Sequence, residues 1–375
     1  MPGYRTESCI LKESGDIEKE WLDLQQRANH SYFQSWGWIE TWLDQIALEL
    51  QPVAVKVWFD GSLVGIGLFV SKEINRRILF RSRAMYLNEY PFDGNNMVIE
   101  YNGLLAAKEH ENAIYMETIA YLLREYRQYD EFCFGAMPEN LAQLCSEQID
   151  IQDVNCIVNE ESTSWSVDLI GLSPGIDGYL ASLSRNRRGQ IRRSMRAYEH
   201  DGDLQIDEAE NVEQALLYFE RLKILHSKYW QSKGEPGSFA NPLWERFHRT
   251  LINRRFDSGE IQLLKVSSHD DDIGYIYNIV LHKRVYVLQT GFSDSNDKRL
   301  MPGYVCHSLA IAYNRSKGML VYDLMHGDAL YKRILCNQRQ KILWFVIQRK
   351  RLKFTAEKFI VDIVRFLRGF SSSSS

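Results

Sequence analysis

The sequence predicts an α+β fold of two tandem lobes, each with a mixed, largely antiparallel sheet flanked by helices. The chain has 375 residues, more than a single hydrophobic core usually accommodates. Apolar residues make up 45% of it, enough to fill a sizeable core. A hairpin, a strand, a helix and a second strand follow one another twice along the chain, so the two halves share one plan.

The first module begins with a helix and a hairpin. Apolar side chains recur every four residues from Trp38 to Leu50, which predicts a helix. Two β-rich runs, 53–59 and 63–70, flank Asp60-Gly61, a pair typical of tight hairpin turns. The remaining predicted elements are a strand at 97–100, a helix at 111–127 and a strand at 132–137.

The second module repeats this order. Runs at 261–266 and 273–281 predict a second hairpin around the acidic turn 269–272. The remaining predicted elements of the module are a strand at 285–291, a helix at 302–317 and a buried strand at 320–325.

Further helices are predicted outside the two modules: a basic one at 184–196, and others at 212–233, 241–256 and 355–367. The last of these has an amphipathic pattern. The expected domains are an N-terminal lobe at 1–165, a C-terminal lobe at 166–350 with a helical insertion at 180–256, a terminal helix at 351–370 and a disordered serine tail at 371–375.

Composition restricts the function. Lysine and arginine number 45 and acidic residues 49, so the net charge of -4 gives no general attraction to DNA or to an anionic membrane. Six cysteines without Cys-x-x-Cys spacing are expected to be reduced, mostly buried thiols. There is no secretory leader pattern, no apolar run of about 18 residues and no cluster of metal ligands. We therefore expect a cytoplasmic protein without a transmembrane segment or a metal.

The turn Met301-Pro302-Gly303 is the first candidate for chemistry, because an apolar helical pattern starts directly after it at Val305. Proline suits the first turn of a helix, and glycine lets a ligand approach the backbone. The N–H groups and the positive dipole end of such a helix suit a pyrophosphate. The same pattern also serves as an ordinary helix start, and both interpretations remain open.

The strand that follows carries polar groups into a Gly-Asp turn. Asp323 stands among apolar neighbours, where a carboxylate needs a partner or a chemical task because its desolvation is costly. Tyr331 and Lys332 lie about one helical turn beyond Gly327-Asp328, which makes both candidates for the mouth at the strand end. A structural aspartate and a surface Tyr-Lys pair are the alternative interpretations.

Two further features are candidates. His226 joins Asp323 as a candidate general base, because histidine accepts protons near neutrality; a core histidine beside an aromatic helix face is the alternative. Arg185, Arg188 and Arg192 are spaced to share one helix face, where they could bind phosphates bidentately. A solvated helix face is the alternative interpretation of that cluster.

Together these motifs resemble a known family, the BioF2-like (CelD-type) acetyltransferase domain, a relative of the FemAB aminoacyltransferases within the GNAT superfamily. The resemblance covers about residues 180–335, and the segment 32–38 is also similar to the opening of these proteins. Members of the group have tandem GNAT-like lobes, in agreement with the repeated plan. The matching motifs are Arg185 to Arg196, Leu225-His226, Tyr229-Trp230, Gly234, Gly237-Ser238-Phe239, Pro302-Gly303, Asp323, Gly327-Asp328 and Tyr331-Lys332.

The resemblance implies transfer of an acyl group from a thioester, expected to be acetyl-CoA, to an amine. It places Tyr331 and Lys332 near the reacting acyl group, with Lys332 as the candidate for stabilising an oxyanion. Val305 departs from the GNAT pattern, which has a small residue at that position. The expected donor-binding residues are Met301, Pro302, Gly303 and Tyr304, and the expected substrate-binding residues are Arg185, Arg188, Arg192, Trp230, Gln289, Gly327 and Asp328.

We therefore expect an N-acyltransferase that uses acyl-CoA and acts on a small or sugar-type amine, with cell-surface polysaccharide synthesis suggested by the family. One alternative is a Fem-like aminoacyltransferase, and only under that alternative is tRNA a partner. The other alternative is a non-catalytic binding module that keeps the arginine cluster.

Overall fold

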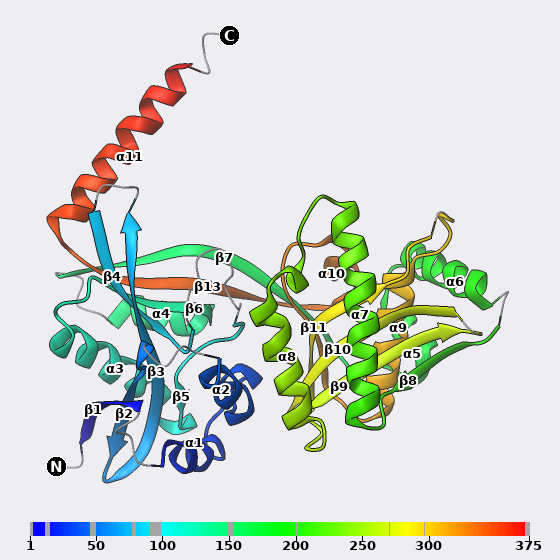
Figure 1. Ribbon diagram of the computed structural model, residues 1–375, viewed down its shortest axis with the longest axis horizontal. Helices are drawn as coiled ribbons and strands as arrows, with labels where there is room; N and C mark the ends of the chain where they lie inside the picture. Colours follow the sequence, from blue (N-terminus) through cyan, green and yellow to red (C-terminus); the bar gives the residue numbers. More distant parts are fainter. Residues whose placement is uncertain are drawn as a thin grey trace. The chain divides into compact units, whose positions relative to one another are not determined.

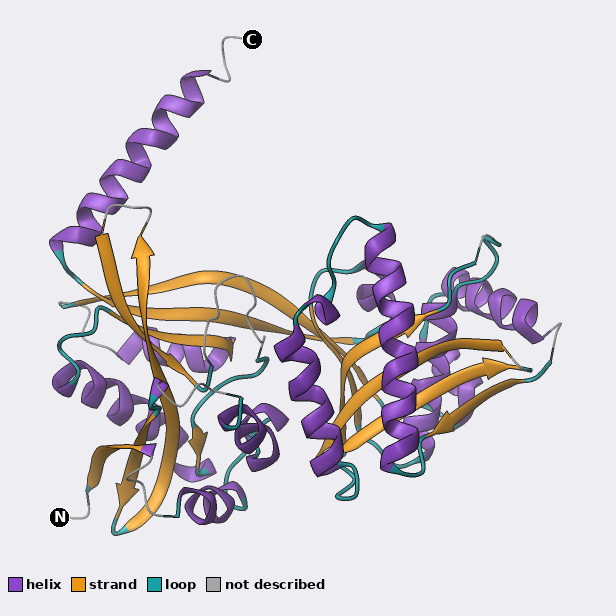
Figure 2. Cartoon of the chain, viewed as in Figure 1, coloured by secondary structure: helices purple, strands orange, loops and turns teal. Residues whose placement is uncertain are grey.

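The chain folds into two compact units. The first contains Met1–Trp36, Ile46–Glu161 and Leu343–Ser375, and the second contains Gly37–Gln45 and Ser162–Ile342. Figure 1 follows the chain through the computed structural model, and Figure 2 shows its helices and strands. The residues that the structure describes are 3–11, 16–45, 50–76, 80–89, 99–148, 153–199, 202–269, 271–295 and 297–371.

These units differ from the predicted limits of 1–165 and 166–350. The last strand, β13 (Gln338–Arg349), returns the chain to the first unit, so residues 343–350 do not belong to the second. Residues 37–45 belong to the second unit instead of the first. There the ring of Trp38 packs against Phe247 with centroids 4.6 Å apart, a long-range contact that local periodicity does not reveal.

The strands of the first unit follow the order β1-β2-β3-β4-β6-β13, and a short strand β5 pairs with β3. β1 to β4 pair antiparallel, whereas β4 and β6 run parallel on either side of the crossover helix α3 (Glu111–Glu125). The bounds are β1 (Tyr4–Ile10), β2 (Val53–Phe59), β3 (Ser62–Arg76), β4 (Phe80–Leu87), β5 (Leu105–Ala106) and β6 (Glu131–Pro138), with helices α1 (Ile17–Gln25), α4 (Glu139–Gln148) and α11 (Leu352–Ser371).

The strands of the second unit follow the order β8-β9-β10-β11-β12-β7. Here too the first four pair antiparallel, and β11 and β12 run parallel on either side of the crossover helix α9 (Pro302–Ser316). The bounds are β7 (Val154–Asp168), β8 (Leu204–Glu208), β9 (Ile261–Ser268), β10 (Asp271–Leu281), β11 (Arg284–Phe292) and β12 (Val321–His326). The strand order therefore repeats, and the predicted fold of tandem mixed sheets is confirmed.

Helices cover both faces of the second sheet. α7 (Val212–Ser232) packs on β9, β10 and β11, and its neighbour is α8 (Pro242–Arg255). α9 contacts the same strands and is flanked by α5 (Gly175–Ser182) and α6 (Arg185–Glu199). Figure 1 shows α7 in front of the sheet and α9 behind it. A core of aliphatic side chains from α5, α6, α9 and the strands fills the layer under α9.

Several predicted elements have different limits in the structure. The helix predicted from Trp38 to Leu50 is α2 (Trp36–Leu43), and residues 46–49 lie outside the described residues. Of the strand predicted at 97–100, the first two residues lie outside the described residues and the last two are not in a strand. The last helix runs through Ser371, which was predicted to start the tail, and the rest of the tail lies outside the described residues.

Two features are absent from the described part of the chain. No helix there combines the length and apolarity needed to cross a bilayer. No group of three histidine, cysteine or carboxylate side chains is arranged there to hold a metal ion.

Candidate active site in the second unit

The parallel strands β11 and β12 separate within the second unit. Their ladder joins three residue pairs, from Arg284 with Val321 to Tyr286 with Asp323. Beyond the ladder β11 continues to Phe292 and β12 continues to His326. Ligands of sheet proteins commonly bind at the carboxyl ends of such strands. The candidate residues near these ends are therefore described first.

Asp323, a predicted general base, lies fully buried where the ladder ends. Arg284 donates to its Oδ2 through Nη2 at 2.7 Å and through Nε at 3.0 Å. Its Oδ1 accepts from the Met325 backbone N–H at 2.8 Å and from the Ser164 hydroxyl at 3.3 Å. Both carboxylate oxygens are thus engaged within the fold, an arrangement that satisfies a buried charge.

Lys332 lies in the short helix α10 (Leu330–Leu335), where its ammonium group holds the turn after β12. It donates to the backbone carbonyls of Met325 and His326, and the first of these bonds measures 3.3 Å. The turn has an unusual backbone, since Met325 has φ of 65° and Gly327 has φ of 124°. Lys332 therefore places a positive charge beside the end of β12.

His307 was not predicted as a site residue, yet it lies against two that were. Its ring stacks on Tyr331, with centroids 5.5 Å apart and planes 12° apart. Burial, followed by the charge of Lys332, lowers the pKa of His307 to about 3, so its imidazole is neutral. Its Nδ1 bonds to the Tyr322 hydroxyl at 3.3 Å, whereas its buried Nε2 has no hydrogen-bond partner among the described residues.

The environment of Tyr331 and His326 keeps both side chains neutral. Burial raises the pKa of Tyr331 to about 12, so its hydroxyl remains a donor near neutrality. Burial and the nearby Lys332 lower the pKa of His326 to about 4. The ammonium group of Lys332 is therefore the cation in this group of side chains, and it lies close to both neutral rings.

A second group of predicted residues surrounds the short 3-10 helix η5 (Ser238–Ala240). His226 bonds through Nδ1 to the Thr290 carbonyl at 3.2 Å, and its Nε2 accepts from the Ser238 N–H at 3.3 Å. Gln289 donates to the Ser238 hydroxyl at 3.0 Å. Trp230 packs 6.0 Å from the His226 ring. Both nitrogens of His226 thus serve the fold, and burial lowers its pKa.

The turn predicted to bind the acyl donor forms the amino end of α9. Pro302 is the first helical residue, and the N-cap residue Met301 supplies no side-chain cap. The Met301 backbone N–H donates instead to the Ser194 hydroxyl of α6 at 2.8 Å. Amides in a first helical turn have no intrahelical acceptor, which leaves those of Gly303 and Tyr304 for other partners. This helix end carries no acidic side chain in its first turn, so it suits an anion.

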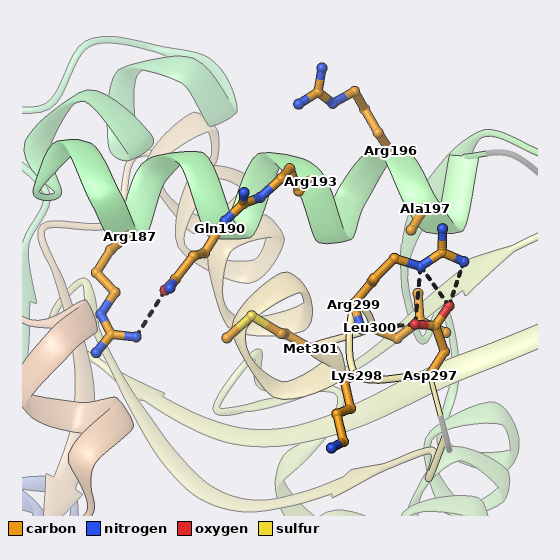
Figure 3. Close-up of a pocket in the computed structure, with 10 residues that line it drawn as sticks. All are labelled: Arg187, Gln190, Arg193, Arg196, Ala197, Asp297, Lys298, Arg299, Leu300 and Met301. Atoms are coloured by element: carbon orange, nitrogen blue, oxygen red, sulfur yellow. Dashed lines mark hydrogen bonds and ion pairs between the residues drawn. The ribbon is translucent and has the colours of Figure 1, made fainter.

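A groove of about 990 Å³ lies beside this helix end, within the second unit. Figure 3 shows its two sides, which are α6 and the segment that leads into α9. Five of the lining side chains are basic, and the acidic Asp297 is bonded by Arg299 at 2.6 Å. The lining residues are Arg187, Gln190, Arg193, Arg196, Ala197, Asp297, Lys298, Arg299, Leu300 and Met301.

The groove uses a different face of α6 from the predicted one. Arg185, Arg188 and Arg192 do not line it, and Arg192 pairs with Asp177 at 2.7 Å. Ile191 and Met195 are buried in the core, and their burial sets which face of α6 points to the groove. Arg187 instead lines the groove, and it lies close enough to the Tyr304 hydroxyl for its charge to act on that group.

The last predicted residues lie in the turn after β12. Gly327 donates its backbone N–H to the Thr163 carbonyl at 3.1 Å, and a side chain added there would approach Lys332. Asp328 is exposed and pairs with Arg333. Tyr229, beside Trp230 on α7, lies close enough to Tyr331 to affect its pKa, which links the two groups of candidate residues.

Comparisons with known proteins bear on residues 185–333 and on the fold of the chain. Residues 185–333 match a family model described as an acetyltransferase (GNAT) domain. FemX shares the fold at a TM-score of 0.60 and 9% identity, over 92% of this chain and 97% of its own. The C-terminal domain of a putative lysylphosphatidylglycerol synthetase from Agrobacterium fabrum shares the fold at a TM-score of 0.53 and 9% identity, over 93% of this chain and 96% of its own. L-PGS from Bacillus licheniformis shares the fold at a TM-score of 0.52 and 8% identity, over 93% of this chain and 95% of its own.

Identities this low show a shared fold alone, and no curated protein sequence matches the chain. The GNAT match is therefore the comparison that bears on chemistry. It contains α6, the turn at Met301 to Gly303 and the pair Tyr331-Lys332. Residues 185–333 therefore match a GNAT acetyltransferase domain, and the chain as a whole shares the fold of FemX.

Proposed function

We propose that this acyltransferase moves an acyl group from acyl-CoA, and specifically acetyl-CoA, to the amine of a small or sugar-type acceptor. One observation carries the proposal: the basic groove opens beside the uncapped amino end of α9. A CoA molecule offers a pyrophosphate and a further phosphate. The helix amides suit the pyrophosphate, and Arg187 and Arg193 suit the remaining negative charge.

The reacting acyl group would lie where β11 and β12 separate. The acceptor nitrogen attacks the thioester carbonyl, which forms the new C–N bond and a tetrahedral oxyanion. Lys332 stabilises this charge as the adjacent ammonium group. The C–S bond then breaks, and the proton released from the nitrogen ends on the sulfur of CoA. The products are an amide and free CoA.

The neighbouring side chains support this chemistry by position. Tyr331 and His307 provide neutral rings beside Lys332. Asp323 holds the end of β12 through Arg284, and His226 holds Ser238 beside Gln289. We therefore assign Asp323 and His226 to positioning instead of proton transfer.

The acceptor assignment rests on the resemblance of the chain to the BioF2-like acetyltransferases. An amine attached to a sugar fits an enzyme of cell-surface polysaccharide synthesis, and an acyl-CoA donor places the reaction in the cytoplasm. Trp230, which is 36% exposed, offers an aromatic surface beside His226 for such an acceptor.

Calorimetry with acetyl-CoA tests the donor. We expect binding to the wild-type chain, and at least about a tenfold weaker affinity when Arg187 and Arg193 are both replaced by alanine, since each forms a charge-assisted bond to phosphate. Arg185→Ala is the control, because this exposed residue lies outside the groove. No binding at about 1 mM acetyl-CoA would reject the proposed donor. Binding of aminoacyl-tRNA without binding of acetyl-CoA would favour the Fem-like alternative.

A further inference from the structure

A pocket of about 310 Å³ lies wholly within the first unit. Its volume is near the lower end of the range for small-molecule sites. Apart from Glu89, its lining residues belong to β3, β4, β6, β7 and β13. The apolar and aromatic part of the lining consists of Ile74, Tyr86, Phe134, Trp344, Phe345 and Val346.

The pocket lies at the end of the parallel strand pair of the first unit. The parallel ladder of β4 and β6 runs from Ala84 with Glu131 to Tyr86 with Cys133, and the last pair lines the pocket. In the second unit the corresponding ladder of β11 and β12 ends at Tyr286 with Asp323, beside the candidate active site. The end of a parallel pair beside a crossover helix is a common position for a ligand.

Glu89 supplies a carboxylate to this pocket. It follows β4 and lines the pocket, and burial alone raises its pKa to about 7. Among the described residues, no hydrogen-bond or ion-pair partner of Glu89 is found. The carboxylate occupies space that a side chain at position 135 would fill, because a Cβ added to Gly135 would lie 2.6 Å from Glu89 Oε1.

The other charges around the pocket do not neutralise Glu89. Arg76 is paired with Glu131, which also accepts hydrogen bonds from Ser82 and Gln348. The remaining titratable groups that line the pocket are Tyr86, Cys133 and Glu160. Burial raises the pKa of both the Tyr86 hydroxyl and the Cys133 thiol, so both stay neutral, and none of the three supplies a positive charge.

We propose that this pocket is a second ligand site, which binds a small molecule through a primary ammonium group with Glu89 as its counter-ion. An ammonium group would supply the missing charge, and the aromatic walls favour a cation over a neutral group. Hydrogen bonds from the ammonium to a desolvated carboxylate are stronger than in water. This site is independent of the proposed acyl-CoA site, since all its residues belong to the first unit.

The proposal predicts a specific pH dependence. An ammonium ligand binds the ionised form of Glu89, which becomes scarce as the pH falls through the pKa of about 7. For a ligand that stays protonated throughout, affinity should fall about tenfold between pH 8 and pH 6. Tyr86 and Cys133 should not contribute a step in this range, because burial raises the pKa of both groups.

The experiment uses cyclohexylamine as the probe and cyclohexanol, its neutral analogue, in calorimetry with the full chain. We expect cyclohexylamine to bind and cyclohexanol to bind at least about tenfold more weakly. Glu89→Gln keeps the shape of the side chain and should weaken cyclohexylamine binding by about tenfold or more. Glu109→Gln, at an exposed position of the same unit outside the pocket, should have no effect.

Three outcomes would overturn the proposal: no binding of cyclohexylamine, equal binding of the two probes, or wild-type affinity in Glu89→Gln. If Glu89→Gln fails to fold, the pH dependence of wild-type binding decides instead, and equal affinities at pH 6 and pH 8 would also overturn the proposal. Acetyl-CoA affinity should stay unchanged in Glu89→Gln, which separates this site from the proposed donor site.

Discussion

The phenol ring of Tyr331 stacks on the imidazole of His307, with centroids 5.5 Å apart. His307 belongs to α9, which begins at the proposed donor turn, and Tyr331 follows the end of β12 in α10. The contact therefore joins the helix that would hold the donor to the segment that carries Lys332. It also buries a histidine that must stay neutral.

His307 should make the protein sensitive to acid. Its pKa is about 3 in the folded chain, below its ordinary 6.5. As the pH falls below 6.5 the unfolded chain binds a proton that the folded chain does not, so stability is lost between about pH 6.5 and pH 3. His307→Phe should reduce the loss of unfolding free energy between pH 7 and pH 5 by roughly 2 kcal/mol. Urea unfolding at both pH values measures it, and an equal acid loss in both proteins would contradict the assignment.

Lys332 should be needed for turnover more than for donor binding. Removal of one oxyanion donor costs on the order of 3 kcal/mol, so Lys332→Ala should lower kcat by about 100-fold while acetyl-CoA affinity stays within about twofold. Lys317→Ala is the matched control, because this exposed lysine lies at the other end of α9. Wild-type kcat in Lys332→Ala would remove Lys332 from the mechanism.

Asp323 should act through structure. Asp323→Asn removes the buried negative charge that pairs with Arg284 and should lower the free energy of unfolding by about 3 kcal/mol. The residual activity should keep the wild-type pH profile. If chemical denaturation instead shows wild-type stability while the pH profile loses a limb, Asp323 is the general base.

Gly291 should be required for the packing of α7 on β11. A Cβ added at this position would lie 2.4 Å from the Leu222 backbone carbonyl oxygen, which cannot move without the helix. Gly291→Ala should therefore lower the free energy of unfolding by about 2 kcal/mol. Gly189→Ala is the control: no atom lies within 4 Å of its added Cβ, and it should be neutral or stabilise α6 by up to about 1 kcal/mol. Equal melting temperatures for the two variants would contradict this.

The elements that depend on short-range sequence patterns were predicted well. The hairpin around Asp60-Gly61 and the strand at 53–59 appear as predicted, because turn chemistry and β-rich runs act within a few residues. The strands β1, β4, β5, β7, β8 and β13 were not predicted. β7 has partly exposed residues at consecutive positions instead of alternating with buried ones, and it is held by partners distant in sequence such as Tyr322.

The sequence by itself determined the repeated plan, the start of α9 at Pro302 and the placing of Tyr331-Lys332 just after a buried strand, since each depends on neighbours along the chain. Only the tertiary structure decided which residues lie close together. Burial of Ile191 turned Arg187 toward the groove, and Arg284, 39 residues away in sequence, neutralised Asp323. Burial and long-range charge pairing depend on how strands and helices pack, which no local periodicity encodes.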